Sequence, residues 1–489
     1  MRLPRTRRQF LTTAGATGLG VSVAGCIGDD DGDDSTPSGD DSNGADDGDD
    51  SANGDDDPPG SDIDIEPTGD YEVAEPVTID FLFSIGGNKG QVVSQMADQF
   101  SQMSDTITVE PIHEGDYGDT WNATLQGIRA EEPPEVVHLN ANHTLQGWAE
   151  NAYIPIENLL PDRLDQADFI PAVTDYYVFQ DTLLGLPFSV STIVAHYNVD
   201  AFDAAGLPTH PDDVSMETFD EYRSISQDVM SAGATPHGAT WPNHNWFYES
   251  WFANQGADFV NNDNGRSAPA TESLVTSDAG ERLFEWILDM EAAEEYLHAS
   301  GWGDARQGYV NEQSAILIDS SSNIQEMTQG AEHAGFQSEV GSIPSYDDWN
   351  GLIIGGGALF VPNGAHSDLE LEAAAEFILW MSQPEQQAHF HSNTGYYPTS
   401  QDAIDILEDD GFYDENPQFW RAYQQLAETE PSSATQGAFI MNHGQIRDEM
   451  TDGFIRMLQG TPVDEALEIA KDGVDELLAD GLERDPRAD

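Results

Sequence analysis

Cysteine and lysine are almost missing from this chain of 489 residues. Its one cysteine, Cys26, leaves no possibility of an intrachain disulfide or of a metal cluster held by thiolates. The lysines are Lys89 and Lys471, so arginine supplies nearly all of the positive charge. Lys and Arg number 17 against 91 Asp and Glu, and the net charge is −74. So little positive charge argues against nucleic acid as a partner, because few phosphates could be neutralised.

The excess of carboxylates has a physical explanation in concentrated salt. At about molar salt the Debye length falls to about 3 Å, so repulsion within an acidic surface is largely screened. We therefore expect the protein of an extreme halophile, in which surface carboxylates serve solvation and acidic pairs say little about catalysis. The apolar fraction is only 38%, but 21 Phe, 15 Tyr and 10 Trp suffice for a sizeable core.

Residues 1–28 predict an export leader that ends in a lipid attachment site. Residues 6–11, TRRQFL, match the twin-arginine pattern, and the following apolar stretch is too short to span a membrane. Residues 23–26, VAGC, resemble the lipobox at which a leader is cut before a lipidated cysteine. A plain leader with an incidental Cys26 is the alternative. Residues 29–75 begin with a long Asp- and Gly-rich run and predict a disordered acidic tether.

From residue 76 onward, strands and helices alternate. Strand patterns at 77–83 and 107–112 are each followed by a helical pattern, and a third strand pattern lies at 133–140, as in α/β sheets. Ligands of such sheets lie beyond the carboxyl ends of the strands. Three polar residues stand at or just past such ends: Ser84, Tyr117 and Asn140.

The stretch from Gly351 to Ser400 organises the rest of the chain. An apolar strand pattern interrupted by Gly355, Gly356 and Gly357 indicates a bulge or a close approach of backbone to a ligand. A helix follows, and the stretch then closes on a glycine turn that carries Tyr396. Strand, helix and aromatic turn predict one wall of a cleft for a small molecule. An ordinary packed strand and helix explain this stretch equally well.

Two further segments contain candidate ligand contacts. Residues 241–252 carry three tryptophans, of which Trp241 and Trp246 fit either a core or a platform for sugar faces. Residues 315–323 predict a buried strand that ends in hydroxyl groups, Ser320 and Ser321.

Several of these segments resemble the extracellular solute-binding proteins of ABC importers, of the carbohydrate type (family 1). The resemblance lies in residues 187–207, 353–359, 377–384 and 394–398, and it extends over most of the chain from Val77 to about Leu478. Within the family, the glycerol-3-phosphate binders are the most similar, here in the form of a haloarchaeal lipoprotein.

The resemblance implies a two-lobed α/β fold of the type II periplasmic-binding-protein kind, with a hinge near Ser191 and Gly341. The expected lobes are residues 76–190 with 313–370, and residues 191–312 with 371–480. The ligand would lie between them. The implied or candidate contacts are Tyr117, Asn140, Ser191, Trp241, Trp246, Ser320, Ser321, Gly356, Tyr396 and Phe439.

Two departures from the glycerol-3-phosphate binders bear on the ligand. Asn140 stands where they usually carry a glutamate, and Phe439 stands where their phosphate-binding arginine is expected. A phenyl ring offers a phosphate no charged partner. We therefore expect a neutral or differently bound ligand, such as a sugar, a polyol or a glycerol-like compound. A phosphodiester held by backbone amides is the alternative.

A secreted, lipid-anchored hydrolase of a glycoside or phosphoester is the competing class. The sequence has no Gly-x-Ser-x-Gly elbow, no His-Glu-x-x-His helix and no phosphate loop. His389 and His391 would point to different faces of their helix. We expect no enzyme, no cofactor and no metal. We expect instead a monomer on the outer face of the cytoplasmic membrane that serves a permease driven by a separate ATPase.

Overall fold

The computed structural model describes residues 73–160, 163–164, 166–180, 182–347 and 349–488. The predicted leader, the lipobox with Cys26 and nearly all of the predicted tether lie outside these residues. Within the part that the structure describes, no helix is both long and apolar enough to cross a membrane.

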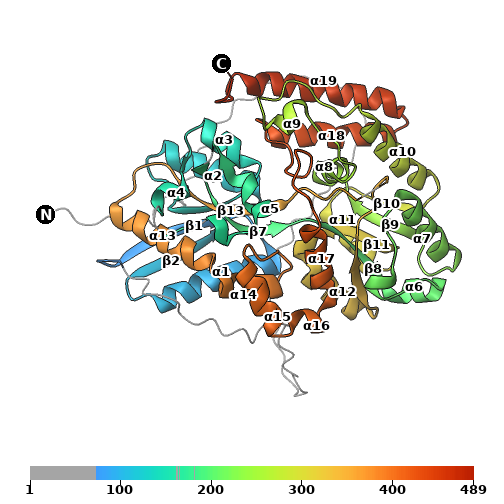
Figure 1. Cartoon of the computed structure of the whole chain (residues 1–489), viewed down its shortest axis with the longest axis horizontal. Helices are drawn as coiled ribbons and strands as arrows, with labels where there is room; N and C mark the ends of the chain where they lie inside the picture. The colour runs from blue at the N-terminus through green and yellow to red at the C-terminus, as the bar shows by residue number, and fades with distance from the viewer. Residues whose placement is uncertain (1–72, 161–162, 165, 181, 348, 489) are drawn as a thin grey trace, which may run out of the picture. The chain divides into compact units, whose positions relative to one another are not determined.

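The first sheet occupies the left half of Figure 1 and confirms the predicted alternation. Its order is β2-β1-β3-β13-β4, and β7 also pairs with β13. Strand β1 is parallel to β2 and β3, whereas β13 is antiparallel to β3 and β7. The carboxyl end of β3 and the start of β13 therefore meet at one edge. The strands are β1 Val77–Phe83, β2 Ile107–His113, β3 Val136–Asn140, β4 Tyr153–Ile154, β7 Leu186–Ser191 and β13 Gly355–Pro362.

Helices pack on this sheet through an aromatic core. Helix α13 begins at a capping box between Ser367 and Glu370, and its apolar face lies on β1. There Phe377 contacts Phe81 and Phe100, with ring centroids 5.2 and 5.3 Å apart. The elements are α1 Gly87–Met103, α2 Tyr117–Arg129, α3 His143–Ala149, α4 Ile156–Leu159, α5 Pro171–Thr174, β5 Val178–Phe179, β6 Thr182–Leu183, α13 Asp368–Met381, α14 Pro384–Ser392, α15 Gln401–Asp409, α16 Phe412–Glu415 and α17 Pro417–Ala427.

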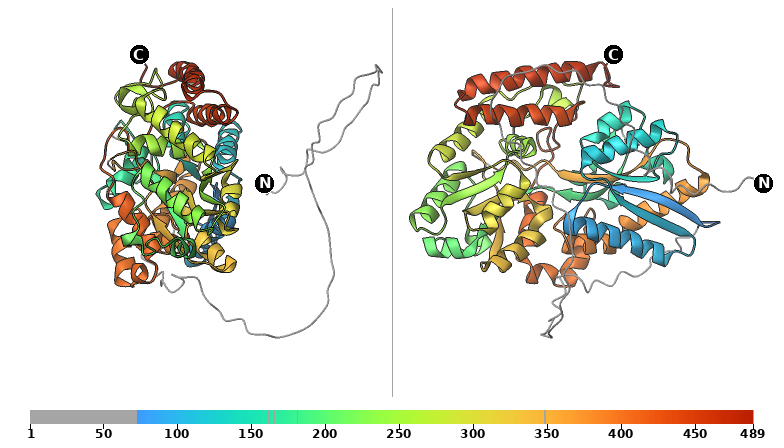
Figure 2. Two further views of the ribbon diagram at one scale, coloured as in Figure 1. Left: turned by 90° about the vertical axis from the view of Figure 1, so that its right-hand side faces the viewer. Right: turned by 180° about the vertical axis from the view of Figure 1, so that it is seen from behind.

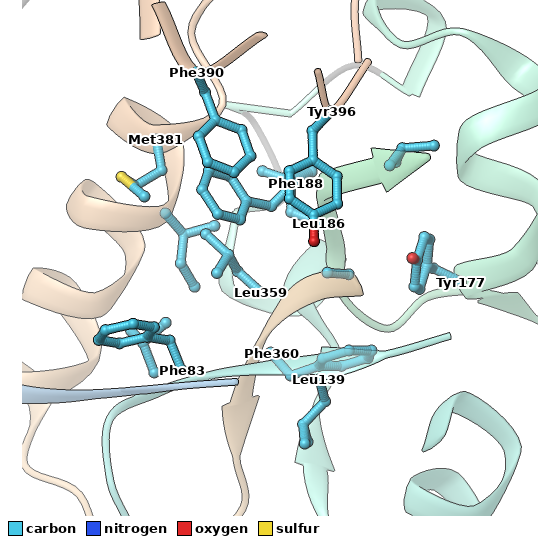
Figure 3. Packing of buried hydrophobic residues seen from close by; sticks show 14 of the residues in the cluster. Phe83, Leu139, Tyr177, Leu186, Phe188, Leu359, Phe360, Met381, Phe390 and Tyr396 are labelled. Carbon is cyan, nitrogen blue, oxygen red and sulfur yellow. The ribbon is translucent and has the colours of Figure 1, made fainter. Parts of the chain in front are cut away.

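A stack of three rings connects this core with the aromatic turn near residue 396 (Figure 3). Phe188 of β7 stacks on Phe390 of α14 with centroids 4.6 Å apart, and Phe390 stacks on Tyr396 at 5.2 Å. The turn is thereby fixed against β7, the strand that pairs with β13. The aromatic turn and the glycine strand β13 are thus connected through β7, whereas the predicted helix between them, α13, packs on β1.

The second sheet lies in the right half of Figure 1 and has the order β10-β9-β11-β8-β12. Strand β9 is parallel to β10 and β11, while β8 is antiparallel to β11 and β12. Only Thr192 separates β8 from β7, so one extended segment connects the two sheets. The strands are β8 Ile193–Asn198, β9 His237–Pro242, β10 Tyr296–Ala299, β11 Ser314–Ser320 and β12 Ser338–Gly341.

Helices surround the second sheet, and the last two, α18 and α19, lie side by side (red in Figures 1 and 2). Their apolar faces join the core of this half, together with those of α8 and α10. The helices are α6 Val199–Ala205, α7 Phe219–Ser231, α8 Asn245–Asn254, α9 Asn261–Gly265, α10 Asp278–Ala292, α11 Trp302–Val310, α12 Ile324–Ala334, α18 His443–Leu458 and α19 Val463–Leu482. The 3-10 turns are η1 Gln166–Asp168, η2 Asp175–Tyr177, η3 Pro211–Asp213 and η4 Ser321–Asn323.

The expected division into 76–190 with 313–370 and 191–312 with 371–480 is wrong in two places. Strands β11 and β12, which were expected in the first lobe, pair with β8 and β9 in the second sheet. Helices α13 and α14, which were expected in the second lobe, contribute to the core of the first. The reason is that the apolar pattern of a strand or helix shows that it is buried, but not against which partner.

Candidate functional site

A cleft of about 700 Å³ lies where the ends of both sheets meet. Residues from β3, β7, β11 and β13 and from the starts of α2, α8 and α11 line it. Seven of the predicted ligand contacts are among the lining residues: Tyr117, Asn140, Ser191, Trp246, Ser320, Gly356 and Tyr396.

The other three predicted residues do not line this cleft. Trp241 is fully buried and stacks on Tyr296, with ring centroids 4.0 Å apart. It is therefore a core residue and not a platform for a sugar. Ser321 is also fully buried and donates its backbone N–H to the Thr192 carbonyl at 2.8 Å. The structure thus places Ser320, rather than Ser321, at the cleft.

Phe439 lies outside the cleft lining as well, against a different part of the fold. Its ring stacks on Phe179, with centroids 6.0 Å apart, and the guanidinium groups of Arg266 and Arg487 each lie 5.4 Å from the ring centre. The expectation of a neutral ligand depended on this residue. It loses that support, because Phe439 does not face the ligand space.

The glycines of β13 bring backbone and side chains into close contact at the cleft wall. Gly356 has φ +87°, and a Cβ there would lie 1.6 Å from the carbonyl oxygen of Ser189. A Cβ at Gly355 would lie 2.5 Å from the Trp246 ring, so the indole can approach only a glycine. Trp246 Nε1 then donates to the Ile354 carbonyl at 3.3 Å, and Asn140 Nδ2 donates to the Gly356 carbonyl at 2.8 Å. These contacts fix the wall.

Arg447 brings a positive charge to the cleft that the sequence analysis missed. Its Nε and Nη2 donate to the two carboxylate oxygens of Glu249 at 3.0 and 3.3 Å. Glu249 is 3% exposed and also accepts from Asn245 Nδ2 at 2.6 Å, so it fixes the guanidinium from behind. Nη1 has no hydrogen-bond partner among the described residues, and Arg447 is one of the residues that line the cleft.

Arg306 repeats this arrangement from α11 in the second half of the protein. Its Nε and Nη2 donate to Asp319 Oδ2 and Oδ1 at 2.7 and 3.3 Å, and Asp319 is fully buried. The guanidinium carbon of Arg306 lies 5.5 Å from the ring centre of Trp302. Here too, Nη1 has no hydrogen-bond partner in the part of the chain that the structure describes.

Lys89 is a third cation at the cleft and comes from the first half of the protein. Its Nζ donates to Asn323 Oδ1, and Asn323 Nδ2 donates to Asp319 Oδ2 at 3.1 Å. Burial lowers the pKa of Lys89 to about 8, and the nearby Arg306 acts in the same direction. The small number of Lys and Arg residues could have identified these three as candidates. In a chain with 17 Lys and Arg against 91 Asp and Glu, each cation is unusual.

The histidines and tyrosines that line the cleft are neutral near pH 7, and two carboxylic acids, Asp116 and Asp448, line it as well. Burial lowers the pKa of both His143 and His244 to about 4. Burial raises the pKa of Tyr396 to about 12, and it also raises the pKa of Tyr117 well above its usual value. The histidines therefore add no charge, and the two phenols remain protonated donors.

Comparison with known proteins identifies the fold and the family. The family model of the bacterial extracellular solute-binding proteins matches residues 95–421. The sn-glycerol-3-phosphate-binding periplasmic protein UgpB of Rhizobium meliloti (strain 1021) is 26% identical over 411 residues, which cover 81% of this chain and 94% of that protein. UgpB of Yersinia enterocolitica is 28% identical over 389 residues, covering 77% and 87%.

Two solved structures are similar to this one at 18% identity and a TM-score of 0.70. One is the GacH receptor of Streptomyces glaucescens GLA.O, with 82% of this chain and 98% of that one covered. The other is UgpB from Mycobacterium tuberculosis in complex with glycerophosphocholine, with 83% and 99% covered. These two likenesses confirm the predicted two-lobed fold. The family model spans more than half of the chain, and the protein therefore belongs to the bacterial extracellular solute-binding proteins.

Proposed function

We propose that this protein captures a small phosphate-bearing polyol outside the cell and delivers it to the permease of an ABC importer. The ligand class is that of glycerol 3-phosphate and the glycerophosphodiesters. The names of the relatives support this class, since several are sn-glycerol-3-phosphate-binding proteins and one solved structure holds glycerophosphocholine. Family membership gives the secreted hydrolase no support.

One observation carries the proposal. The cleft contains two arginines, and each donates hydrogen bonds to a buried carboxylate that is not among the lining residues. Arg447 and Arg306 each use Nε and Nη2 for their carboxylate and leave Nη1 without a partner among the described residues. A fixed guanidinium loses little conformational entropy when it binds an anion. An anionic group such as a phosphate gives these donors a charged acceptor, which a neutral sugar does not.

The rest of the cleft suits a polyol. Asn140, Ser191 and Ser320 are polar side chains at the wall, and Trp246 and Tyr396 bring aromatic groups to it. We propose these residues, with Tyr117 and the Gly356 backbone, as ligand contacts. The space of about 700 Å³ exceeds what a three-carbon phosphate fills, which favours a glycerophosphodiester.

A neutral oligosaccharide is the second candidate. Trp246, Trp302 and Tyr396 together bring three aromatic side chains to the cleft, and aromatic faces pack against the apolar faces of sugars. The solved GacH receptor is described with acarbose. Binding of a sugar in this way would leave both arginines without a charged partner.

Capture requires the two halves to close on the ligand, and we propose a hinge at the two crossings between the sheets. The first crossing is Thr192, beside Ser191, and the second follows Gly341 on the way to β13. A ligand favours the closed state only to the extent that it binds that state more tightly. Lys89 and Asn323 join the halves across the cleft and would be among the contacts formed on closure.

The N-terminal residues support a proposal for location. Residues 1–28 fit twin-arginine export followed by lipidation of Cys26, and residues 29–75 fit a self-repelling acidic tether. We propose a halophilic lipoprotein, monomeric and held at the outer face of the cytoplasmic membrane. A single lipid chain anchors only weakly, so stable attachment needs a second chain or another membrane contact.

A thermal-shift panel on the full chain in molar KCl tests the ligand class. The ligands are glycerol 3-phosphate and glycerophosphocholine, compared with glycerol, glucose, maltose and trehalose. A ligand at 100 times its Kd adds about 2.7 kcal/mol of stability, which raises the midpoint measurably. We expect shifts with the phosphate-bearing compounds only. A shift with maltose or trehalose alone would replace this proposal with the oligosaccharide alternative.

A further inference from the structure

A second group of ligating side chains lies at the far end of the first sheet, away from the cleft. Glu135 directly precedes β3, whose other end carries Asn140 at the cleft. His366 lies between β13 and α13, and Glu370 lies in the first turn of α13. One ligating atom from each of these three residues lies within 4.8 Å of the other two.

His366 is oriented as a ligand and lacks a partner on the side that faces the carboxylates. Its side chain is 1% exposed. Nε2 lies 2.8 Å from the Pro362 carbonyl oxygen and therefore carries a proton. Nδ1 makes no hydrogen bond to the described residues and lies 3.8 Å from Glu135 Oε1, too far for a hydrogen bond. A histidine that ligates a metal typically donates its other ring N–H in this way.

Glu135 is also buried, and one of its two carboxylate oxygens has a hydrogen-bond donor. Its side chain is 1% exposed, and Oε2 accepts the backbone N–H of Asp80 at 2.7 Å. Oε1 is the atom nearest to His366 Nδ1. A buried carboxylate oxygen that faces an imidazole lone pair is unfavourable unless a positive charge lies between them. The charge is supplied either by a second proton on the imidazole or by a cation.

We propose that Glu135, His366 and Glu370 bind a divalent cation of the zinc class. Zinc accepts imidazole nitrogen and carboxylate oxygen at about 2.0–2.2 Å, so two of its tetrahedral ligands lie about 3.3 Å apart. The observed 3.8 Å between Nδ1 and Oε1 needs only a small contraction. The cation joins the start of β3 to the connection between β13 and α13. Its role is to stabilise the first half of the protein, and it takes no part in ligand capture.

Zinc content of the full chain tests this site. Chelator-treated protein is dialysed against Zn²⁺ in molar KCl, with excess Mg²⁺ to occupy surface carboxylates, and the bound zinc is counted. We expect the wild type to retain one more Zn²⁺ per chain than His366→Gln. His333→Gln, on α12, is the matched control and should retain as much zinc as the wild type. Equal zinc in the wild type and His366→Gln would overturn the proposal.

A second variant covers the case in which His366→Gln fails to fold. Glu370→Gln preserves an acceptor for the capping box with Ser367 but weakens the cation site. Zn²⁺ should raise the thermal midpoint of the wild type and of His333→Gln, and it should raise that of Glu370→Gln less. If Zn²⁺ shifts none of the midpoints, His366 is instead a doubly protonated partner of Glu135, and the cation site does not exist.

Discussion

At the scale of single residues, the two arginines of the cleft depend on Glu249 and Asp319, carboxylates that are not among the lining residues. Burial alone would raise the pKa of Glu249, but Arg447 and His443 outweigh burial and hold that pKa well below its usual value. Glu249 therefore stays ionised and keeps Arg447 both charged and in place. Loss of Arg447 would leave the buried carboxylate of Glu249 without its partner and would lower the free energy of unfolding. The ion pair thus both positions Arg447 at the cleft and stabilises the packing of α8 against α18.

Replacing Arg447 with lysine keeps the charge but removes the fork that Glu249 holds. We expect the variant to bind glycerol 3-phosphate about tenfold or more weakly, the equivalent of one charge-assisted hydrogen bond. Calorimetric titration measures the Kd. Arg456→Lys is the matched control, because Arg456 lies exposed on the same helix. Equal losses in both variants, or none in Arg447→Lys, would remove Arg447 from the site.

His138 makes stability depend on pH. Burial lowers its pKa to about 3, whereas an unfolded histidine has a pKa of about 6.5. Between these values the unfolded state binds one more proton, so the free energy of unfolding falls as the pH is lowered from about 6.5. His138→Gln should reduce this slope by up to about 1.4 kcal/mol per pH unit, measured by urea unfolding in molar KCl. An unchanged slope relative to His333→Gln would contradict the assignment.

The sequence predicted cleft residues correctly where they lie at strand ends. It did not distinguish residues whose position depends on the direction of the side chain. Tyr117, Asn140 and Ser320 reach the cleft because the end of a strand, or the start of the helix after it, has one position in an α/β sheet. Trp241 and Trp246 looked equivalent, but Trp241 points from β9 into the core and Trp246 lies at the start of α8 beside Gly355. Local composition does not encode that difference.

At the scale of elements, we expect the glycine strand β13 to tolerate substitution least among the strands that line the cleft. At Gly356, φ is +87° and a Cβ would lie 1.6 Å from a backbone oxygen. Gly356→Ala should lower the free energy of unfolding by about 2 kcal/mol or more, because backbone has to move. Gly303→Ala is the control, since no atom lies within 4 Å of a Cβ there. Similar effects of both substitutions would contradict this account of β13.

The same scale shows which elements could be predicted. Strand β1 appears with the predicted bounds because its apolar residues alternate, and the predicted strand at 107–112 appears as β2. Residues 186–198 form two strands, β7 and β8, which enter different sheets on either side of Thr192. The assignment of β11 and α13 to lobes failed because pairing partners come from distant parts of the chain.

At the scale of the whole molecule, a very acidic protein brings three of its few cations to one cleft, beside Asp116 and Asp448. The chain carries −74, yet Lys89, Arg306 and Arg447 all line one cleft. Concentrated salt screens the acidic surface over a few ångströms, and it affects the partly buried cleft much less. A direct contact between an anion and one of these cations is therefore screened less in concentrated salt than repulsion across the surface.

Closure should depend on the contact that Lys89 makes with Asn323 between the two halves. Lys89→Met keeps the length of the side chain but removes the donor. We expect a larger radius of gyration for the unliganded variant in small-angle scattering, together with a several-fold weaker affinity. Lys471→Met, which changes the chain's other lysine on α19, is the control. Identical scattering of both variants would show that this contact does not favour closure.

The central claim is that clamped arginines hold a phosphate in the cleft. Its most direct test is calorimetric titration of the wild-type full chain with glycerol 3-phosphate and with glycerol, both in molar KCl. We predict that the phosphate ester binds at least about 100-fold more tightly, because two charge-assisted contacts contribute about 3 kcal/mol. Equal affinities for the two compounds, or measurable binding of glycerol alone, would contradict the account.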